Sequence, residues 1–153
     1  MWVPPEEKDP VVLHAPTRKS IACFGAVNLR TGRLVTLFSP VFNAETFKEF
    51  LLKLVRYRTP HRTMRLICDN AKYHHATMLQ PFIDDHRRVL RLDFLPPYSP
   101  ELNPIERVWK RTRTIATHNQ HFETLQDLVD VVAAQFDVWA RPNLELQRLC
   151  GKI

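Results

Sequence analysis

Residues 95–110 read LPPYSPELNPIERVWK, a stretch with four prolines. Each proline holds its own φ at about −65° and disfavours the helical conformation in the residue before it, so the loop has few conformations to lose on folding. Asn103 suits an N-cap, Pro104 suits the first helical position, and Glu106 then takes the third. The stretch therefore predicts a rigid loop that determines where one helix begins, and with it the place of one carboxylate.

The chain before this loop predicts strands that alternate with helices. Residues 20–29 and 33–38 are apolar runs on either side of 30–32, Arg-Thr-Gly, which is typical of a β-hairpin. From Asn43, an expected N-cap, apolar residues recur at helical spacing until Pro60 ends the segment. The hairpin is therefore expected to lead into an amphipathic helix.

The same alternation continues to the end of the chain. Residues 64–68 form a short apolar run that predicts a buried strand ending at Asp69 and Asn70. The periodicity then predicts a helix over 77–87, a half-buried strand over 90–94, and helices over 104–116 and 123–139. This order is typical of an α/β sheet covered by helices.

Length and composition restrict the class of protein. With 153 residues, 44% hydrophobic and 25% charged, the chain is expected to be one soluble domain. It has neither a membrane-spanning apolar run nor a signal peptide, so we expect a cytoplasmic protein without a membrane partner. Cys23, Cys68 and Cys150 are far apart, which argues against a disulfide framework and a zinc site. The net charge of +6 favours polyanionic partners.

Two carboxylates are candidates for chemistry. Asp69 directly follows a strand, and ligands of open α/β sheets usually bind beyond the carboxyl ends of the strands. The alternative is that Asp69 only caps a turn, and that Glu106 only stabilises its helix through the helix dipole and an ion pair with Lys110. The local patterns leave both interpretations open.

Taken together, LICDNAKYHH at 66–75 and LPPYSPELNPIERVWK at 95–110 resemble the catalytic core of DDE transposases of the mariner-like insertion-sequence superfamily. In that family a strand ends in Asp-Asn-Ala with a His shortly after, and a later loop reads Leu-Pro-x-Tyr-Ser-Pro-x-Leu-Asn-Pro-x-Glu with a Trp three residues on. The matching residues here include Asp69, Asn70, His74, Glu106 and Trp109. The resemblance covers roughly 2–139 and implies a ribonuclease-H-like mixed sheet flanked by helices.

The resemblance implies that Asp69 and Glu106 are the second and third catalytic carboxylates and bind Mg²⁺ or Mn²⁺, with two ions in the complete enzyme. Two divalent cations can activate an attacking oxygen and stabilise the leaving oxygen at a phosphodiester, and Mg²⁺ prefers oxygen ligands. The substrate would be DNA, as transposon ends and target. Asn70 would contact this DNA, and His74 would contact it or orient Asp69.

The residues after Glu106 are strongly basic. Arg107, Lys110, Arg111 and Arg113 predict a track for DNA phosphates, and a solvated basic helix face has the same pattern. Trp109, one turn after Glu106, is expected in the core rather than as a platform for base stacking.

The family's first catalytic Asp precedes a Trp-x-Pro segment that 2–4, Trp-Val-Pro, matches. We therefore expect 1–153 to be a single catalytic domain truncated at its N-terminus, lacking its opening strand, the first Asp and the helix-turn-helix region that binds transposon ends. Glu6, Glu7 and Asp9 have no predicted strand to aim them. Another polypeptide would supply the strand, or Val11–Leu13 would replace it, or the fold would be marginal.

The resemblance to DDE transposases leaves two possible functions. The first is the catalytic part of a transposase, which cleaves DNA and transfers strands as a homodimer or with a complementing N-terminal segment. The second is a non-catalytic remnant that binds DNA or a transposase subunit through its basic surface. With two of three carboxylates, the chain alone is expected to bind metal poorly and to cleave little DNA.

Overall fold

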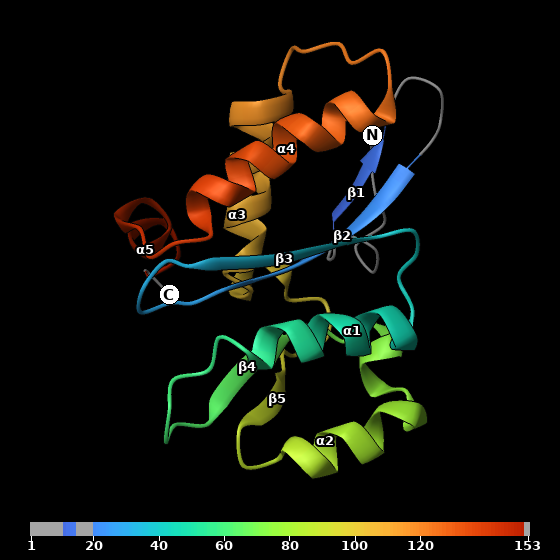
Figure 1. Cartoon of the computed structure of the whole chain (residues 1–153), viewed down its shortest axis with the longest axis vertical. Helices are drawn as coiled ribbons and strands as arrows, with labels where there is room; N and C mark the ends of the chain where they lie inside the picture. Colours follow the sequence, from blue (N-terminus) through green and yellow to red (C-terminus); the bar gives the residue numbers. More distant parts are fainter. Residues whose placement is uncertain (1–10, 15–19, 152–153) are drawn as a thin grey trace. The chain divides into compact units, whose positions relative to one another are not determined.

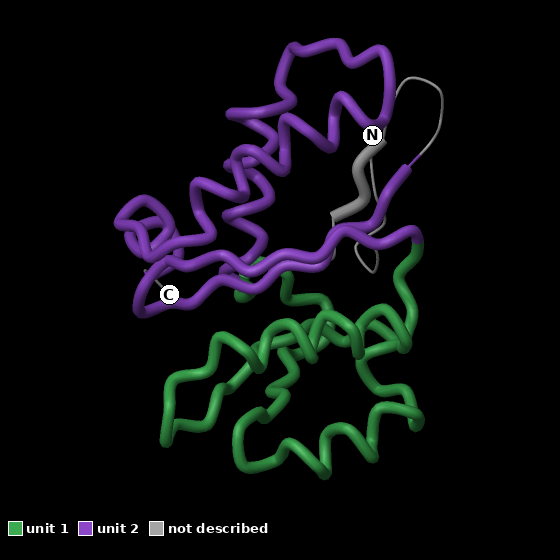
Figure 2. The backbone as a smooth tube through the Cα atoms, viewed as in Figure 1, with its two compact units in different colours: residues 1–9, 41–103 green, residues 10–40, 104–153 purple. Residues whose placement is uncertain are grey.

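The computed structural model describes residues 11–14 and 20–151, which form two compact units. Unit 1 contains 41–103, and unit 2 contains the described residues of 11–40 and 104–151 (Figure 2). Each unit combines a small sheet with helices, which confirms the α/β class. No helix in the described part of the chain is long and apolar enough to cross a membrane.

Unit 1 is built around two parallel strands. Strands β4 (Met64–Cys68) and β5 (Leu90–Phe94) pair in register from Met64 and Leu90 to Cys68 and Phe94. Parallel strands end at the same edge of a sheet, so the residues that follow β4 and β5 leave from one edge. The other elements of unit 1 are α1 (Ala44–Val55), α2 (Gln80–His86) and the 3₁₀ turns η2 (Lys72–His75), η3 (Thr77–Leu79) and η4 (Pro100–Leu102).

Helix α1 begins where the sequence predicts. The Asn43 Oδ1 accepts the Thr46 N–H at 2.9 Å, and the Thr46 Oγ1 accepts the Asn43 N–H at 3.0 Å, so each residue satisfies a backbone donor of the other. The apolar face of the helix is buried through Phe47, Phe50, Leu51, Leu54 and Val55. Capping and burial both follow from local sequence.

Two expectations for unit 1 need correction. The prediction of a buried strand over 64–68 is wrong, because only Cys68 is buried and Ile67 is 37% exposed. Among the described strands β4 pairs with β5 alone, so the strand has few neighbours to cover it. The helix expected over 77–87 begins as the 3₁₀ turn η3 and becomes α-helical at Gln80.

Unit 2 is an antiparallel sheet with helices on one side (Figure 1). The sheet has the order β1 (Val11–His14), β2 (Ser20–Val27), β3 (Leu34–Ser39). The helices are α3 (Ile105–Thr112), the π-helical segment η5 (Arg113–Thr117), α4 (Leu125–Trp139) and α5 (Leu144–Cys150). The sequence analysis did not identify α5, which has only seven residues.

The predicted hairpin is confirmed as β2 and β3, with a longer turn than expected. The Asn28 Oδ1 accepts the N–H groups of Arg30 and Thr31 at 2.9 and 3.2 Å, and Gly32 has a φ of 75°. Strand β1 pairs with β2 from Val11 opposite Cys23 to His14 opposite Ser20. Val11–Leu13, the segment that could replace the opening strand expected to be missing, thus pairs with the hairpin. Residues 2–4, Glu6, Glu7 and Asp9 lie outside the described residues.

The core of unit 2 lies between its sheet and its helices. Trp109 is 1% exposed, so the expectation that it belongs to the core is confirmed. Its indole meets β2 at Gly25, where a Cβ atom would lie 2.3 Å from the Trp109 Cη2. The core cluster also contains Cys23, Leu34, Ile105, Val108, Ala116, Leu128, Val132, Phe136, Trp139, Leu146 and Cys150. All three cysteines are buried, and none of them is in a disulfide bond.

Candidate active site

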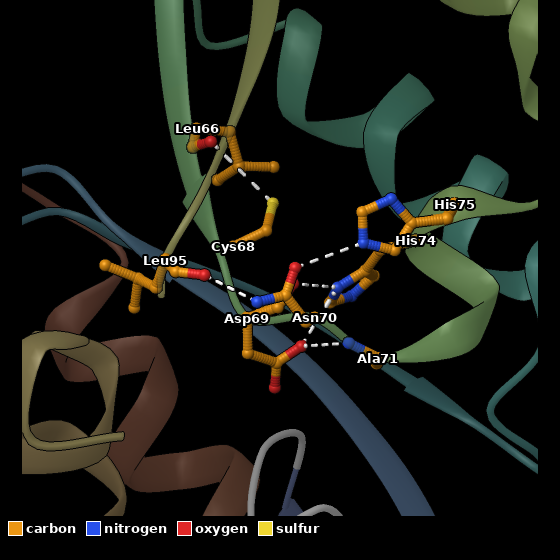
Figure 3. A network of polar contacts seen from close by, with 8 residues as sticks. All are labelled: Leu66, Cys68, Asp69, Asn70, Ala71, His74, His75 and Leu95. Carbon is orange, nitrogen blue, oxygen red and sulfur yellow. Dashed lines mark hydrogen bonds and ion pairs between the residues drawn. The ribbon is translucent and has the colours of Figure 1, made fainter. Parts of the chain in front are cut away.

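Asp69 is the first residue after β4, and its carboxylate is held on one side. Its Oδ1 accepts the Ala71 N–H at 2.9 Å and lies 3.0 Å from the His74 Nδ1 (Figure 3). The side chain is 25% exposed, and Oδ2 makes no hydrogen bond among the described residues. One carboxylate oxygen is therefore held in place by the residues that follow β4.

His74 is the buried partner of Asp69. Its Nδ1 lies 3.0 Å from both the Oδ1 and the backbone oxygen of Asp69. Both oxygens accept hydrogen bonds, so Nδ1 carries the proton and donates. The ring packs against Phe47 and the edge of Tyr73, with centroid distances of 4.4 and 4.5 Å. Packing fixes the imidazole, and the imidazole in turn orients the carboxylate of Asp69.

Asn70 joins the two strand ends of unit 1. Its Nδ2 donates to the Leu95 carbonyl, and its Oδ1 lies 3.2 Å from the His75 Nε2 (Figure 3). The Leu95 N–H also donates to the Cys68 carbonyl at 2.8 Å. Asn70 was expected to contact substrate, and the structure places its amide in a link between the loop after β4 and the start of the proline-rich loop.

The proline-rich loop leads to Glu106, and the predicted start of the helix at the end of this loop is wrong by one residue. Tyr98 has a φ of 58°, which is uncommon for a residue with a side chain, and is 87% exposed. Asn103 is extended, with Pro104 in the cap position of α3. The helix thus begins one residue later than expected, and Glu106 is its second residue rather than its third. Glu106 is half-buried.

The four basic residues after Glu106 fall into two pairs. The Arg107 Nη1 donates to the Leu149 carbonyl, and the Arg111 Nε donates to the Glu145 Oε1, each at 3.2 Å. Lys110 and Arg113 are exposed. One pair therefore fastens α3 to α5, and the other faces solvent.

Arg107 also acts on the thiol of Cys150. Burial raises the pKa of the Cys150 thiol above its ordinary value of 9.0, while the charge of Arg107 acts in the opposite direction. Burial is the larger effect, so the thiol is protonated at neutral pH. The Cys150 Sγ lies 3.6 Å from the Pro104 carbonyl and donates to it at the start of α3.

The donor chemistry of Asp69 fits a hard divalent cation, because such ions prefer carboxylate oxygens and one oxygen of Asp69 is held in place. Within the described ranges, no three His, Cys, Asp or Glu side chains gather as a metal site. Asp69 belongs to unit 1 and Glu106 to unit 2. Asp69 could hold a metal ion only together with further ligands.

One feature of this region is not predicted from the sequence. The rings of His75 and Phe94 pack against each other in a tilted arrangement, with a centroid distance of 4.1 Å and an interplanar angle of 30°. The only signal of this pair in the sequence is His75, because its partner Phe94 lies on another strand and far away in sequence. The pair joins the turn after β4 to the end of β5, and His75 also contacts Asn70, the neighbour of Asp69 in sequence.

Two solved structures of transposases have a fold similar to that of this chain. The catalytic domain of Mos1 mariner transposase superposes with a TM-score of 0.69 over 93% of this chain and 72% of that chain, at 18% identity. The Mos1 strand transfer complex gives a TM-score of 0.64 over 99% of this chain and 45% of that chain, at 19% identity. This likeness confirms the ribonuclease-H-like fold implied by the two motifs.

The family follows from sequence comparison. Residues 1–129 match the family model of the DDE superfamily endonucleases, and the chain belongs to this family. A relative from Sinorhizobium fredii (strain NBRC 101917 / NGR234), the uncharacterized protein y4pE/y4sA, is 36% identical over 106 residues. That match spans 69% of this chain and 75% of the relative. The family expected from the two motifs is thereby confirmed.

Proposed function

We propose that this chain is the catalytic part of a DNA transposase, which cleaves phosphodiesters and transfers strands with the help of divalent metal. The observation that carries the proposal is the carboxylate of Asp69, which a buried His74 orients at the end of β4 in a DDE superfamily endonuclease. A carboxylate held in this way keeps its geometry when a charged ligand arrives. Asp69 is the second catalytic carboxylate in this proposal, and Glu106 is the third.

Each residue has a distinct part in the proposed reaction. The Oδ2 of Asp69 and the carboxylate of Glu106 would bind Mg²⁺ or Mn²⁺, with two ions in the complete enzyme. Metal bound there would activate a water or 3′-hydroxyl and stabilise the leaving oxygen. Asn70 keeps the loop of Asp69 attached to Leu95.

The proposed partners are DNA and a source of the first carboxylate. Exposed Lys110 and Arg113 suit contacts to DNA phosphates, as transposon ends or target. Arg107 and Arg111 are engaged with α5 and would contribute positive charge rather than direct contacts. The first Asp would come from a complementing N-terminal segment, and the active form would be a homodimer or that complex. The reaction would take place on DNA in the cytoplasm.

The test is a cleavage assay on the completed protein. The upstream segment with the first Asp is fused or co-expressed, and nicking of labelled DNA with candidate element ends is measured in Mg²⁺. Asp69→Ala and Glu106→Ala should each lower the rate at least about 100-fold, because each removes a metal ligand. Asp93→Ala is the matched control, because Asp93 is a carboxylate on β5 that pairs with exposed Arg65.

Two outcomes would contradict the proposal. Cleavage by Asp69→Ala and Glu106→Ala at the rate of the parent protein would show that these carboxylates are not the site. A completed protein that binds DNA without cleaving it would favour the alternative of a non-catalytic remnant. Cleavage by the chain alone at the rate of the completed protein would contradict the role given to the first Asp.

A further inference from the structure

The tilted ring pair of His75 and Phe94 lies at the surface of unit 1. Phe94, the last residue of β5, is 39% exposed, and His75, from the turn after β4, is also exposed. Aromatic side chains in soluble proteins usually contribute to stability by being buried. Two neighbouring rings that both stay exposed therefore offer aromatic surface on which a ligand can stack.

The ring of His75 is held in place by the protein. Because the Asn70 Nδ2 donates to the Leu95 carbonyl, the Oδ1 of the same amide faces His75. That oxygen accepts a hydrogen bond, so the His75 Nε2 carries the proton and donates. A ring fixed by one edge loses little freedom when a ligand stacks on it, which favours binding.

The ring pair is linked to the loop that carries the proposed catalytic carboxylate. The His74 Nδ1 donates to Asp69 and the His75 Nε2 donates to Asn70, so two consecutive residues of one turn hold two consecutive residues of the loop after β4 (Figure 3). In a DNA strand, each phosphate is flanked by two bases. A strand with its phosphate at Asp69 would therefore bring a neighbouring base toward the turn that carries His75.

We propose that His75 and Phe94 form a stacking site for an unpaired DNA base beside the phosphate that Asp69 addresses. The inference rests on the proposed function and adds a nucleotide-binding subsite to it. Bases of any sequence stack on aromatic rings, because every base has a π face. The exposed Lys72 on the same turn and the net charge of +6 suit a polyanionic strand.

The chain contains a matched control for this site. Phe82 and His86 of α2 stack at the same centroid distance of 4.1 Å, with an interplanar angle of 25°. Phe82 is 5% exposed and His86 is half-buried, so this second pair presents less ring surface than His75 and Phe94. If exposure of the rings lets His75 and Phe94 contribute to DNA binding, substitution of His86 should leave DNA binding unchanged.

The experiment measures the stacking directly. A single-stranded oligonucleotide with one 2-aminopurine is titrated with the full chain in EDTA, and both affinity and fluorescence quenching are recorded. The wild-type chain should quench the fluorescence. Phe94→Leu, which keeps an apolar side chain but removes the ring, and His75→Ala should each bind about 5- to 100-fold more weakly and lose the quenching. His86→Ala should behave like the wild type, and thermal unfolding checks that every variant is folded.

Several results would overturn the inference. The inference fails if the chain does not bind the oligonucleotide, or binds it without quenching its fluorescence. It also fails if Phe94→Leu and His75→Ala quench like the wild type, or if the wild type binds an oligonucleotide that lacks bases with equal affinity. A protein partner would then be the better occupant. The proposed function fails in a different readout, the cleavage rate of Asp69→Ala in Mg²⁺, so the two failures are distinguishable.

Discussion

At the scale of single residues, the packing of Trp109 depends on the absence of a side chain at Gly25. The indole of Trp109 occupies the space that a side chain at Gly25 would need, with only 2.3 Å between the Cη2 and the position of a Cβ. Trp109 follows Glu106 by less than one helical turn. The packing of this ring on β2 therefore also fixes the rotation of the helix that carries the proposed third carboxylate.

Gly25→Ala should lower the free energy of unfolding by about 1–3 kcal/mol, because the added methyl group overpacks a buried ring. Urea unfolding monitored by circular dichroism measures the change. Trp109→Phe provides the matched test, since a smaller ring leaves room for the methyl group. The loss caused by Gly25→Ala should be smaller when Trp109→Phe is also present, and additive losses would contradict the proposed clash.

The site residues show the same dependence on neighbours. His74 binds Asp69 through one N–H that reaches two oxygens, and its ring packs on Phe47 of α1. Burial of a polar ring is tolerated because its hydrogen bond is satisfied. The geometry of Asp69 thus depends on a core contact as well as on the residues that surround it in sequence.

At the scale of elements, the turn between β2 and β3 holds α5 in place. The Asn143 Oδ1 caps α5 by accepting the Leu146 N–H at 2.8 Å, and its Nδ2 donates to the Gly32 carbonyl at 2.9 Å. The Gln147 Nε2 donates to the Arg30 carbonyl at 2.8 Å. Because α5 also contacts Arg107 and Arg111, this turn supports the helix that begins beside Glu106.

Asn143→Ala should destabilise the chain by about 1–3 kcal/mol, because it removes both the cap of α5 and the link to the hairpin turn. Thr124→Ala is the comparison, since Thr124 caps α4 through a single bond to the Asp127 N–H. It should cost about 1 kcal/mol. Asn143→Ser keeps a capping oxygen and should lie between the two. Equal losses for Asn143→Ala and Thr124→Ala in urea unfolding would exclude the link to Gly32 as a source of stability.

At the scale of the whole molecule, the net charge of +6 is the property that bears most on DNA. Contacts to phosphates release counterions, so their contribution falls as salt increases. The exposed basic side chains of the described residues offer mainly such contacts. Binding to duplex DNA is therefore expected to be weak and independent of sequence.

The affinity for two unrelated duplexes, measured by fluorescence anisotropy, should be similar and should fall at least about tenfold between 50 and 200 mM salt. Lys110→Ala combined with Arg113→Ala should reduce the slope of log affinity against log salt by about two. Arg56→Ala combined with Arg62→Ala, two exposed arginines of unit 1, is the charge-matched control and should change it less. Tight, salt-insensitive binding to one duplex would be the opposite of this expectation.

Features that depend on neighbours in the chain could be predicted from the sequence. The cap of α1 at Asn43, the hairpin around Gly32 and the strand that ends just before Asp69 all follow from residues a few positions apart. The two motifs at 66–75 and 95–110 also identified the family. These features are local, because turns, caps and periodic apolar faces are decided over one or two turns of chain.

Features that join distant residues became visible only in three dimensions. The exposure of Ile67, the contact of Gly25 with Trp109, and the packing of His75 against Phe94 each depend on a partner or a neighbouring strand far away in sequence. Helix α5 has too few residues for a clear periodic signal, and its cap and contacts come from Asn143 and the hairpin turn. Such contacts are selected by packing and hydrogen bonding in three dimensions, which local spacing along the chain does not encode.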